Sequence, residues 1–129
     1  MQTDYALQAV SHFFYIISTS MDQNRIKQAH ALVSELLAAI NTRDSEAIQT
    51  LCHFSGACAD EVFEAIDSYF KRGAVLALGP APDWYPMNDG ALGMACELFA
   101  DGKPGEARLH LDVADKDGVP ALHYQFIGS

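Results

Sequence analysis

The sequence predicts an α+β domain, in which about four N-terminal helices cover one face of a C-terminal antiparallel β-meander. Three observations lead to this prediction. Apolar residues recur at helical spacing before residue 73. Beyond it, short runs alternate between apolar and polar residues, as in half-buried strands. Eight of the nine glycines also lie after residue 72, where a meander needs its turns.

Two long helices are expected first, over residues 4–17 and 24–42. Thr3 or Asp4 can cap the first helix, whose apolar residues recur every three or four positions. The second helix has one apolar face, and Lys27 lies on its polar side. That apolar face consists of Ile26, Ala29, Val33, Leu36, Leu37 and Ile40.

Two shorter helices follow. Asp44 or Ser45 can cap the third, which is short. The fourth is predicted over residues 60–72, because two basic residues in its last turn suit the negative end of a helix. Gly73 can then supply the left-handed residue that ends it.

The second half is interpreted as a meander of short strands. Pro86 restricts its strand to an edge or a bulge, because proline cannot donate a ladder hydrogen bond. Turns are expected at residues 88–90, 101–105 and 115–118. The predicted strands are residues 75–78, 84–87, 91–99, 106–114 and 119–127.

The last two strands allow a register to be predicted. A four-residue turn at residues 115–118 pairs Ala114 with Val119. This register places apolar residues of both strands on one face, which the helices must then cover. The apolar pairs are Leu111 with Leu122, Leu109 with Tyr124, and Ala107 with Phe126; the polar pairs are His110 with His123, and Arg108 with Gln125.

The segment from Ala31 to Leu51 resembles the helix, N-x-x-D turn and short helix that open many NTF2-like domains, with Asn41 and Asp44 at the two turn positions. The resemblance implies a cone-shaped, cystatin-like α+β fold. Its hollow is lined by apolar side chains, and a buried aspartate or histidine there can act as a base. It also implies a homodimer formed through the sheet.

Length and charge limit the function. The chain has 129 residues, which is typical of one domain, and we expect residues 1–129 to form it. It carries 17 acidic residues against 8 basic ones, a formal net charge of −9. Nucleic acids and anionic membranes require a cationic patch, so neither is expected as a partner. A basic protein partner remains compatible with this charge.

Cysteine and histidine suggest no metal site. Three cysteines are an odd number that argues against a disulfide framework, so a reducing cytoplasm is expected. Cys52, His53 and Cys58 form the one cluster that could hold a metal, but it lacks a close second pair of ligands. The sequence also lacks the phosphate-binding, dinucleotide-binding and hydrolase motifs of many enzymes. We therefore expect no metal, no cofactor and no catalytic residue.

A partner-binding surface is predicted around the fourth helix and the loops near the tryptophan. Carboxylates on one helix side attract a basic partner, and loop aromatics supply contact area. Two plainer interpretations stay open: the carboxylates form a solvated face, and the aromatics close the end of the cone. The candidate residues are Asp60, Glu61, Glu64, Asp67, Asp83, Trp84, Tyr85 and Asp89.

A second candidate is the polar face of the last hairpin, where His110 and His123 are expected to meet beside Arg108. Paired imidazoles can bind a metal, exchange protons or respond to pH. The alternative is that these three side chains are ordinary solvated residues of an exposed sheet face.

Two functions are compatible with the sequence, and we favour the first because the enzyme motifs are missing from the sequence while its acidic charge is pronounced. The first is a non-enzymatic acidic binding protein, which in size and acidity resembles the small bacterial immunity proteins that neutralise a cognate toxin. Such an inhibitor would present carboxylates where a basic toxin expects phosphates. The second is an NTF2-like protein with a small-molecule site or an active site in the hollow of its sheet. An ionisable side chain inside that hollow would favour the second.

Overall fold

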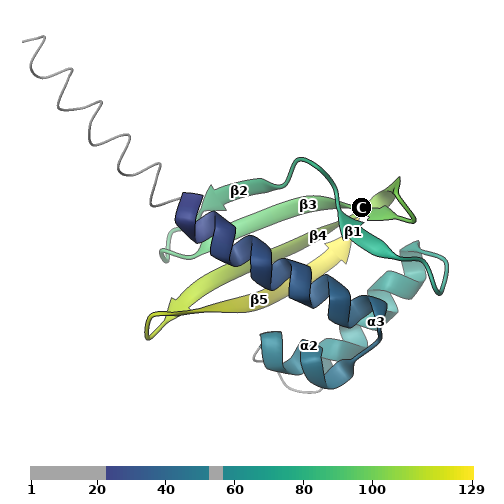
Figure 1. Ribbon diagram of the computed structural model, residues 1–129, viewed down its shortest axis with the longest axis horizontal. Coiled ribbons are helices and arrows are strands. Elements are labelled where there is room, and N and C mark those ends of the chain that lie inside the picture. The colour runs from purple at the N-terminus through teal and green to yellow at the C-terminus, as the bar shows by residue number, and fades with distance from the viewer. Residues whose placement is uncertain (1–22, 53–56) are drawn as a thin grey trace, which may run out of the picture.

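In the described part of the chain, three helices pack against one face of a curled, five-stranded antiparallel sheet (Figure 1). The computed structural model describes residues 23–52 and 57–129. A long helix runs through residues 23–41 and crosses the sheet, and two shorter helices lie near its C-terminal end (Figure 1). The predicted α+β class is therefore confirmed. The predicted helix over residues 4–17 lies outside the described residues.

The described helices follow the apolar pattern of the sequence. Helix 23–41 buries Val33 and Leu36 completely, as its predicted face requires. Helix α2 spans Ser45–Cys52, and Asp44 caps it by accepting a hydrogen bond from the backbone N–H of Ala47 at 3.1 Å.

Helix α3 spans Ala57–Tyr69, so it begins and ends three residues earlier than predicted. Lys71 and Arg72 consequently lie beyond the helix rather than in its last turn. Gly73 has the predicted positive φ, +92°, but it lies four residues beyond Tyr69, so it belongs to the turn after the helix and does not end it.

The sheet is built around its two longest hairpins. Strands β1 and β2 both pair with β3, at opposite ends of the same edge, so together they act as one interrupted edge strand. Pro86 lies in β2, at this edge, as predicted. The strands are β1 (Leu76–Leu78), β2 (Asp83–Pro86), β3 (Leu92–Ala100), β4 (Lys103–Lys116) and β5 (Val119–Gly128).

Both long hairpins turn more tightly than the sequence predicted. Asp101 and Gly102 connect β3 to β4, and Asp117 and Gly118 connect β4 to β5; all four residues have positive φ. Two-residue turns with positive φ match the twist of the strands, and Asp-Gly is among the residue pairs that favour them. The expected loops at residues 101–105 and 115–118 were therefore too long.

The shorter turn changes the predicted register of β4 and β5. Lys116 pairs with Val119, so the strands near the turn are offset by two residues from the prediction. A bulge between His110 and Leu111 then shifts the pairing by one more residue. None of the six predicted pairs forms: the observed pairs are Leu111 with Tyr124, Val113 with Leu122, Asp112 with His123, Leu109 with Ile127, His110 with Phe126, and Arg108 with Gly128.

The core lies between the helices and the sheet. Inward side chains of β3, β4 and β5, such as Met94, Leu109 and Leu122, are fully buried against helix 23–41, α2 and α3. Helix α3 packs mainly on β5. Within the described residues, no helix has the length and apolar character needed to cross a membrane.

Candidate functional site

The acidic surface predicted on the fourth helix lies on α3. Asp60, Glu61 and Glu64 are all exposed. Each lacks an ion pair with any residue of the described ranges 23–52 and 57–129. These three side chains, which we call the α3 carboxylates, therefore keep their charge available to a partner.

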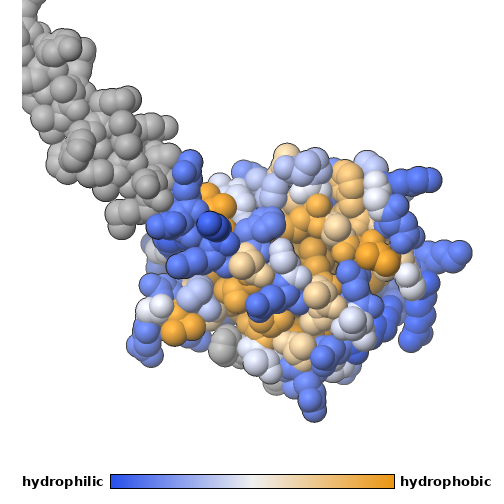
Figure 2. All heavy atoms as spheres, viewed as in Figure 1, coloured by the Kyte–Doolittle hydropathy of each residue, from blue (hydrophilic) through white to orange (hydrophobic). Residues whose placement is uncertain are grey.

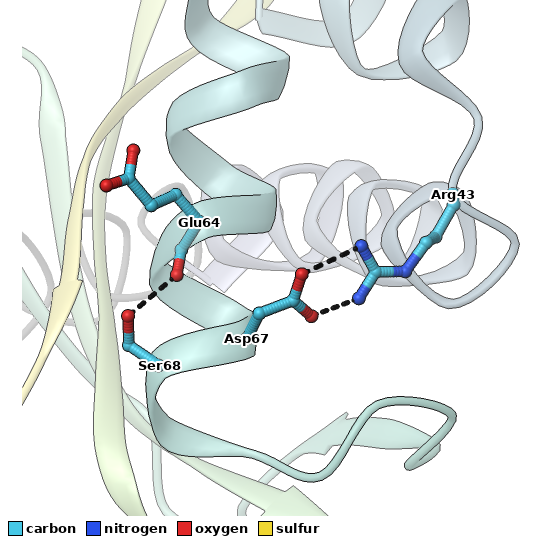
Figure 3. Close-up of polar contacts among 4 residues, drawn as sticks. All are labelled: Arg43, Glu64, Asp67 and Ser68. Atoms are coloured by element: carbon cyan, nitrogen blue, oxygen red, sulfur yellow. Dashed lines mark hydrogen bonds and ion pairs between the residues drawn. The ribbon is translucent and has the colours of Figure 1, made fainter.

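Asp67, on the next turn of α3, differs from them. Its carboxylate accepts two hydrogen bonds from the Arg43 guanidinium, which follows helix 23–41 (Figure 3). The hydrogen bonds from Arg43, together with its positive charge, lower the pKa of Asp67 despite an opposing effect of desolvation. The same guanidinium lies 5.1 Å from the ring centre of Phe63. Asp67 thus links α3 to the end of helix 23–41. Its charge is used in part within the protein and is less available to a partner.

The geometry around Glu64 separates it from this ion pair. Ser68 donates a hydrogen bond of 2.8 Å to the backbone oxygen of Glu64, which leaves the Glu64 carboxylate uninvolved. Figure 3 shows the side chains of Glu64 and Asp67 pointing to different sides of α3. The predicted acidic stripe is therefore narrower than the sequence suggested.

The predicted aromatic patch is divided between two faces of the sheet. Trp84 packs against the core, whereas the Tyr85 ring lies over Gly93 on the outer face, the one turned away from the helices. Neighbouring residues in a strand point to opposite sides, so the two aromatics cannot form one surface. Trp84 fits the plainer interpretation, in which it closes one end of the core.

The remaining acidic candidates lie at the β2 end of the molecule. Asp83 is exposed in the first position of β2, opposite Ala95. Asp89 accepts a hydrogen bond of 3.0 Å from the backbone N–H of Ala91 and so stabilises the turn before β3. Asp89 has a local structural role, and Asp83 remains available to a partner.

The outer sheet face holds an acid that the sequence analysis did not select as a site residue. Asp112 has an exposed fraction of 8% and is the one buried charged or polar side chain among residues 23–52 and 57–129. Nδ1 of His123 lies 3.2 Å from its Oδ1, yet Oδ1 accepts no hydrogen bond from the described residues. Gln125 donates a long hydrogen bond of 3.4 Å to Oδ2. Asp112 pairs with Gly93 of β3, and the Tyr85 ring lies over Gly93. Tyr85 therefore covers the outer face beside Asp112.

His110 belongs to a separate cluster on the same face. Its ring stacks on Phe126 with the centroids 4.2 Å apart. Burial lowers the pKa of His110, and the positive charge of Arg108 adds to this effect. The predicted meeting of His110 and His123 does not occur, because the two-residue turn pairs His123 with Asp112, and the bulge then gives His110 Phe126 as its partner.

The described residues place no carboxylate and no imidazole in the hollow of the sheet, because Asp112 faces outward and the inward positions are mostly apolar. Among the cysteines, Cys96 is buried there, and burial raises the pKa of its thiol. His53 and the side chain of Cys58 lie outside the described residues. In the described part of the chain, histidine, cysteine, aspartate and glutamate form no group of three that could bind a metal.

Two open grooves flank helix 23–41. One has a volume of about 450 Å³ and lies between this helix and β1; its polar lining comes from His30, Ser34 and Asn41. The other, of about 490 Å³, lies between the same helix and α2, and carries Glu35 and Asp44. Figure 2 shows apolar surface exposed among polar residues on this side of the molecule.

Comparison with known proteins adds no further assignment. No protein family, curated protein or solved structure matches this chain.

Proposed function

We propose that this protein is a non-enzymatic acidic binding protein that neutralises a basic protein partner, in the manner of an immunity-type inhibitor of a toxin. One observation carries the proposal: Asp60, Glu61 and Glu64 are exposed on one helix and lack an ion pair within the described residues. Arg43 and Asp67 link that helix to the end of helix 23–41. A partner therefore meets three carboxylates on one helix.

Charge would act in two ways in such a complex. The net charge of −9 would attract a cationic partner over distances comparable to the Debye length, about 10 Å at 0.1 M salt. At contact, the α3 carboxylates would pair with lysines or arginines that the partner otherwise uses to bind phosphate or another anion. Binding would then block that anion site without any chemical step.

The alternative is an NTF2-like, cone-shaped domain that binds a small molecule or catalyses a reaction in the hollow of its sheet. The curled sheet and the covering helix support that fold family. The inward side chains of the described residues give such a site no carboxylate or imidazole to act as acid or base, which is why we favour protein binding. A cytoplasmic location and a homodimer through the outer sheet face belong to the same set of proposals.

The test is a comparison of two triple variants that change the net charge equally. Asp60→Asn, Glu61→Gln and Glu64→Gln remove the α3 carboxylates. Exposed acids elsewhere supply the control, in which Glu106→Gln, Asp115→Asn and Asp117→Asn are combined. Each protein is immobilised and exposed to a native lysate at low and at moderate salt.

We expect wild type and the control to retain the same stoichiometric basic protein, and the α3 variant to bind it at least tenfold more weakly. Moderate salt should weaken the wild-type complex. Equal losses of affinity in the two variants would show that binding depends only on the net charge of the protein. Recovery of no basic partner by the wild-type protein would contradict the proposal.

A further inference from the structure

We infer that the groove between helix 23–41 and α2 binds a basic amphipathic helix of the partner protein. This inference rests on the proposed binding of a cationic protein, and it adds a second contact surface and the secondary structure of the segment that occupies it. Four features of the groove support it: the apolar floor, the hydrogen-bonded threonine hydroxyls, the acidic rim and, among the described residues, the absence of a lining cation.

The floor of the groove is apolar and shallow. Ala38 and Ala39 contribute it from helix 23–41, and Ala47 and Leu51 from α2. Three alanines leave room for another backbone to approach closely, and a side chain as large as leucine can fill the space between them. The groove has a volume of about 490 Å³, which suits several side chains of a protein segment.

Two threonines make the groove more apolar than their residue type suggests. The Thr42 hydroxyl donates to the backbone oxygen of Ala38 at 3.0 Å, and the Thr50 hydroxyl donates to that of Glu46 at 2.9 Å. Both hydroxyls are therefore satisfied within their own helices. A bound apolar side chain would not leave either of these donors without an acceptor.

The rim of the groove is acidic. Glu35 and Asp44 line it, and Glu46 is exposed on the first turn of α2. No lysine or arginine lines it within the described residues. Arg43, next to Asp44 in the chain, is engaged by Asp67. The groove thus complements a segment that carries apolar residues flanked by lysine or arginine.

A helix fits this groove better than an extended strand does. Both walls are helices, and α2 has eight residues, a length of about 12 Å or two turns. A strand would need free backbone donors and acceptors along the groove, whereas a helix needs only side-chain packing. Among the described residues, the lining of the second groove, beside β1, includes no carboxylate, so it gives a cationic segment no such attraction.

The experiment uses the whole protein and a defined probe. The probe is a fluorescently labelled peptide of four helical turns, with leucine at positions i, i+3, i+4 and i+7 and lysine elsewhere. A scrambled peptide of the same composition and a leucine–glutamate peptide of the same pattern serve as comparisons. Fluorescence anisotropy gives the affinity, and backbone amide NMR shifts locate the site.

Two kinds of variant test the groove. Glu35→Gln with Asp44→Asn removes the rim charge, and asparagine preserves the helix cap that Asp44 provides. Glu106→Gln with Asp115→Asn is the matched charge control. Ala38→Gln narrows the groove from an exposed helical position, and Ala31→Gln is its control on the same helix. Because Ala38 also lines the groove beside β1, the amide shifts decide which groove the peptide occupies.

We expect the lysine peptide to bind at least tenfold more tightly than either comparison peptide, with shifts at Ala39, Ala47 and Leu51. Loss of the rim charges should weaken it about three- to tenfold, since each carboxylate contributes a modest surface interaction. Ala38→Gln should weaken it further, and both controls should match wild type. Removal of the α3 carboxylates should leave peptide affinity within twofold, which separates this inference from the proposed function.

Three results would overturn the inference. One is equal binding of the scrambled peptide. Another is equal weakening by the rim variant and its charge control. The third is a set of amide shifts that maps to α3 or to the groove beside β1. A partner bound through the α3 carboxylates alone would then still satisfy the proposed function.

Discussion

The two faces of the β4–β5 hairpin differ in chemistry, although residues of the two faces alternate along the same strands. On the inner face, Leu111 and Leu122 are completely buried in the apolar core. On the outer face, Asp112 is buried beside His123, while Phe126 is 49% exposed and stacks on His110. The inner face therefore owes its stability to burial, and the outer face owes its arrangement to particular partners.

This difference determines how an error in the predicted register affects the residues assigned to each face. A shift of two residues keeps every side chain on its original face, so the inner positions of β4 survive the wrong turn length. A shift of one residue moves each side chain to the opposite face. The bulge beside His110 does this to the end of β5, where Ile127 takes the inward place predicted for Phe126. An error of two residues in the predicted register therefore leaves the apolar face correctly assigned, whereas it makes every predicted polar pair wrong.

The largest expected effect comes from the inner face. Leu111→Ala should lower the free energy of unfolding by about 3 kcal/mol, because it leaves a cavity in a fully buried site. Arg108→Ala, at an exposed outer position of the same strand, should change it by less than about 0.5 kcal/mol. Urea denaturation followed by circular dichroism measures both. Similar losses in the two variants would contradict the division between the faces.

The helices and strands could be predicted because their pattern records burial directly. Helix 23–41 buries Val33 and Leu36 where the spacing places them, and Asp44 caps α2 as its residue type suggests. The bulge left no comparable signal. Nothing in the residues around Gln125 distinguishes a bulged strand from a regular one, because the bulge depends on how two strands fit over a shared core.

The candidate site was predictable only in part, for the same reason. Exposure of Asp60 and Glu64 follows from the helical pattern alone. The pairing of Arg43 with Asp67 joins residues 24 positions apart and depends on how two helices cross. One feature was available and overlooked: a strand containing Trp84 and Tyr85 must place them on opposite faces.

A second prediction concerns close packing on the outer face. A Cβ at position 93 would lie 2.2 Å from Cε2 of Tyr85, so Gly93→Ala must displace the ring. We expect a loss of about 1–3 kcal/mol, as for other overpacked sites. The displaced ring lies on the opposite side of the sheet from the core residues that Leu111 contacts.

Tyr85→Ala provides the control for this displacement. In the Tyr85→Ala background, Gly93→Ala should be nearly neutral, because the obstructing ring is gone; denaturation of all four proteins gives the coupling. Additive losses would show that the alanine disturbs the backbone of β3 rather than the tyrosine.

A smaller effect is expected from the pair formed by Asp112 and His123. His123→Ala removes the imidazole whose Nδ1 lies 3.2 Å from Oδ1 of the buried Asp112 carboxylate, and should lower the free energy of unfolding by about 1 kcal/mol. In an Asp112→Asn background the same substitution should lose less, because no charge remains to be stabilised. A double-mutant cycle measures the difference, and a coupling of zero would remove any stabilising role for the pair.

The smallest effect is a dependence on pH that His110 introduces. Burial, assisted by the charge of Arg108, lowers the pKa of folded His110 below its ordinary value of 6.5. Since the unfolded chain then takes up the proton more readily, this contribution to stability is complete above the unfolded pKa and is lost as pH falls through and below it.

His110→Phe keeps an aromatic ring against Phe126 and removes the titration. The loss of stability between pH 7.5 and pH 5.5 should therefore be smaller in this variant than in wild type, as denaturant midpoints at the two pH values can show. Arg108→Gln should reduce the loss only slightly, because burial is the larger cause. A wild-type protein that gains stability on acidification relative to His110→Phe would reverse the sign of the argument. It would mean that the stacked face favours the charged imidazole, and that the outer face accepts protons where the inner face excludes charge.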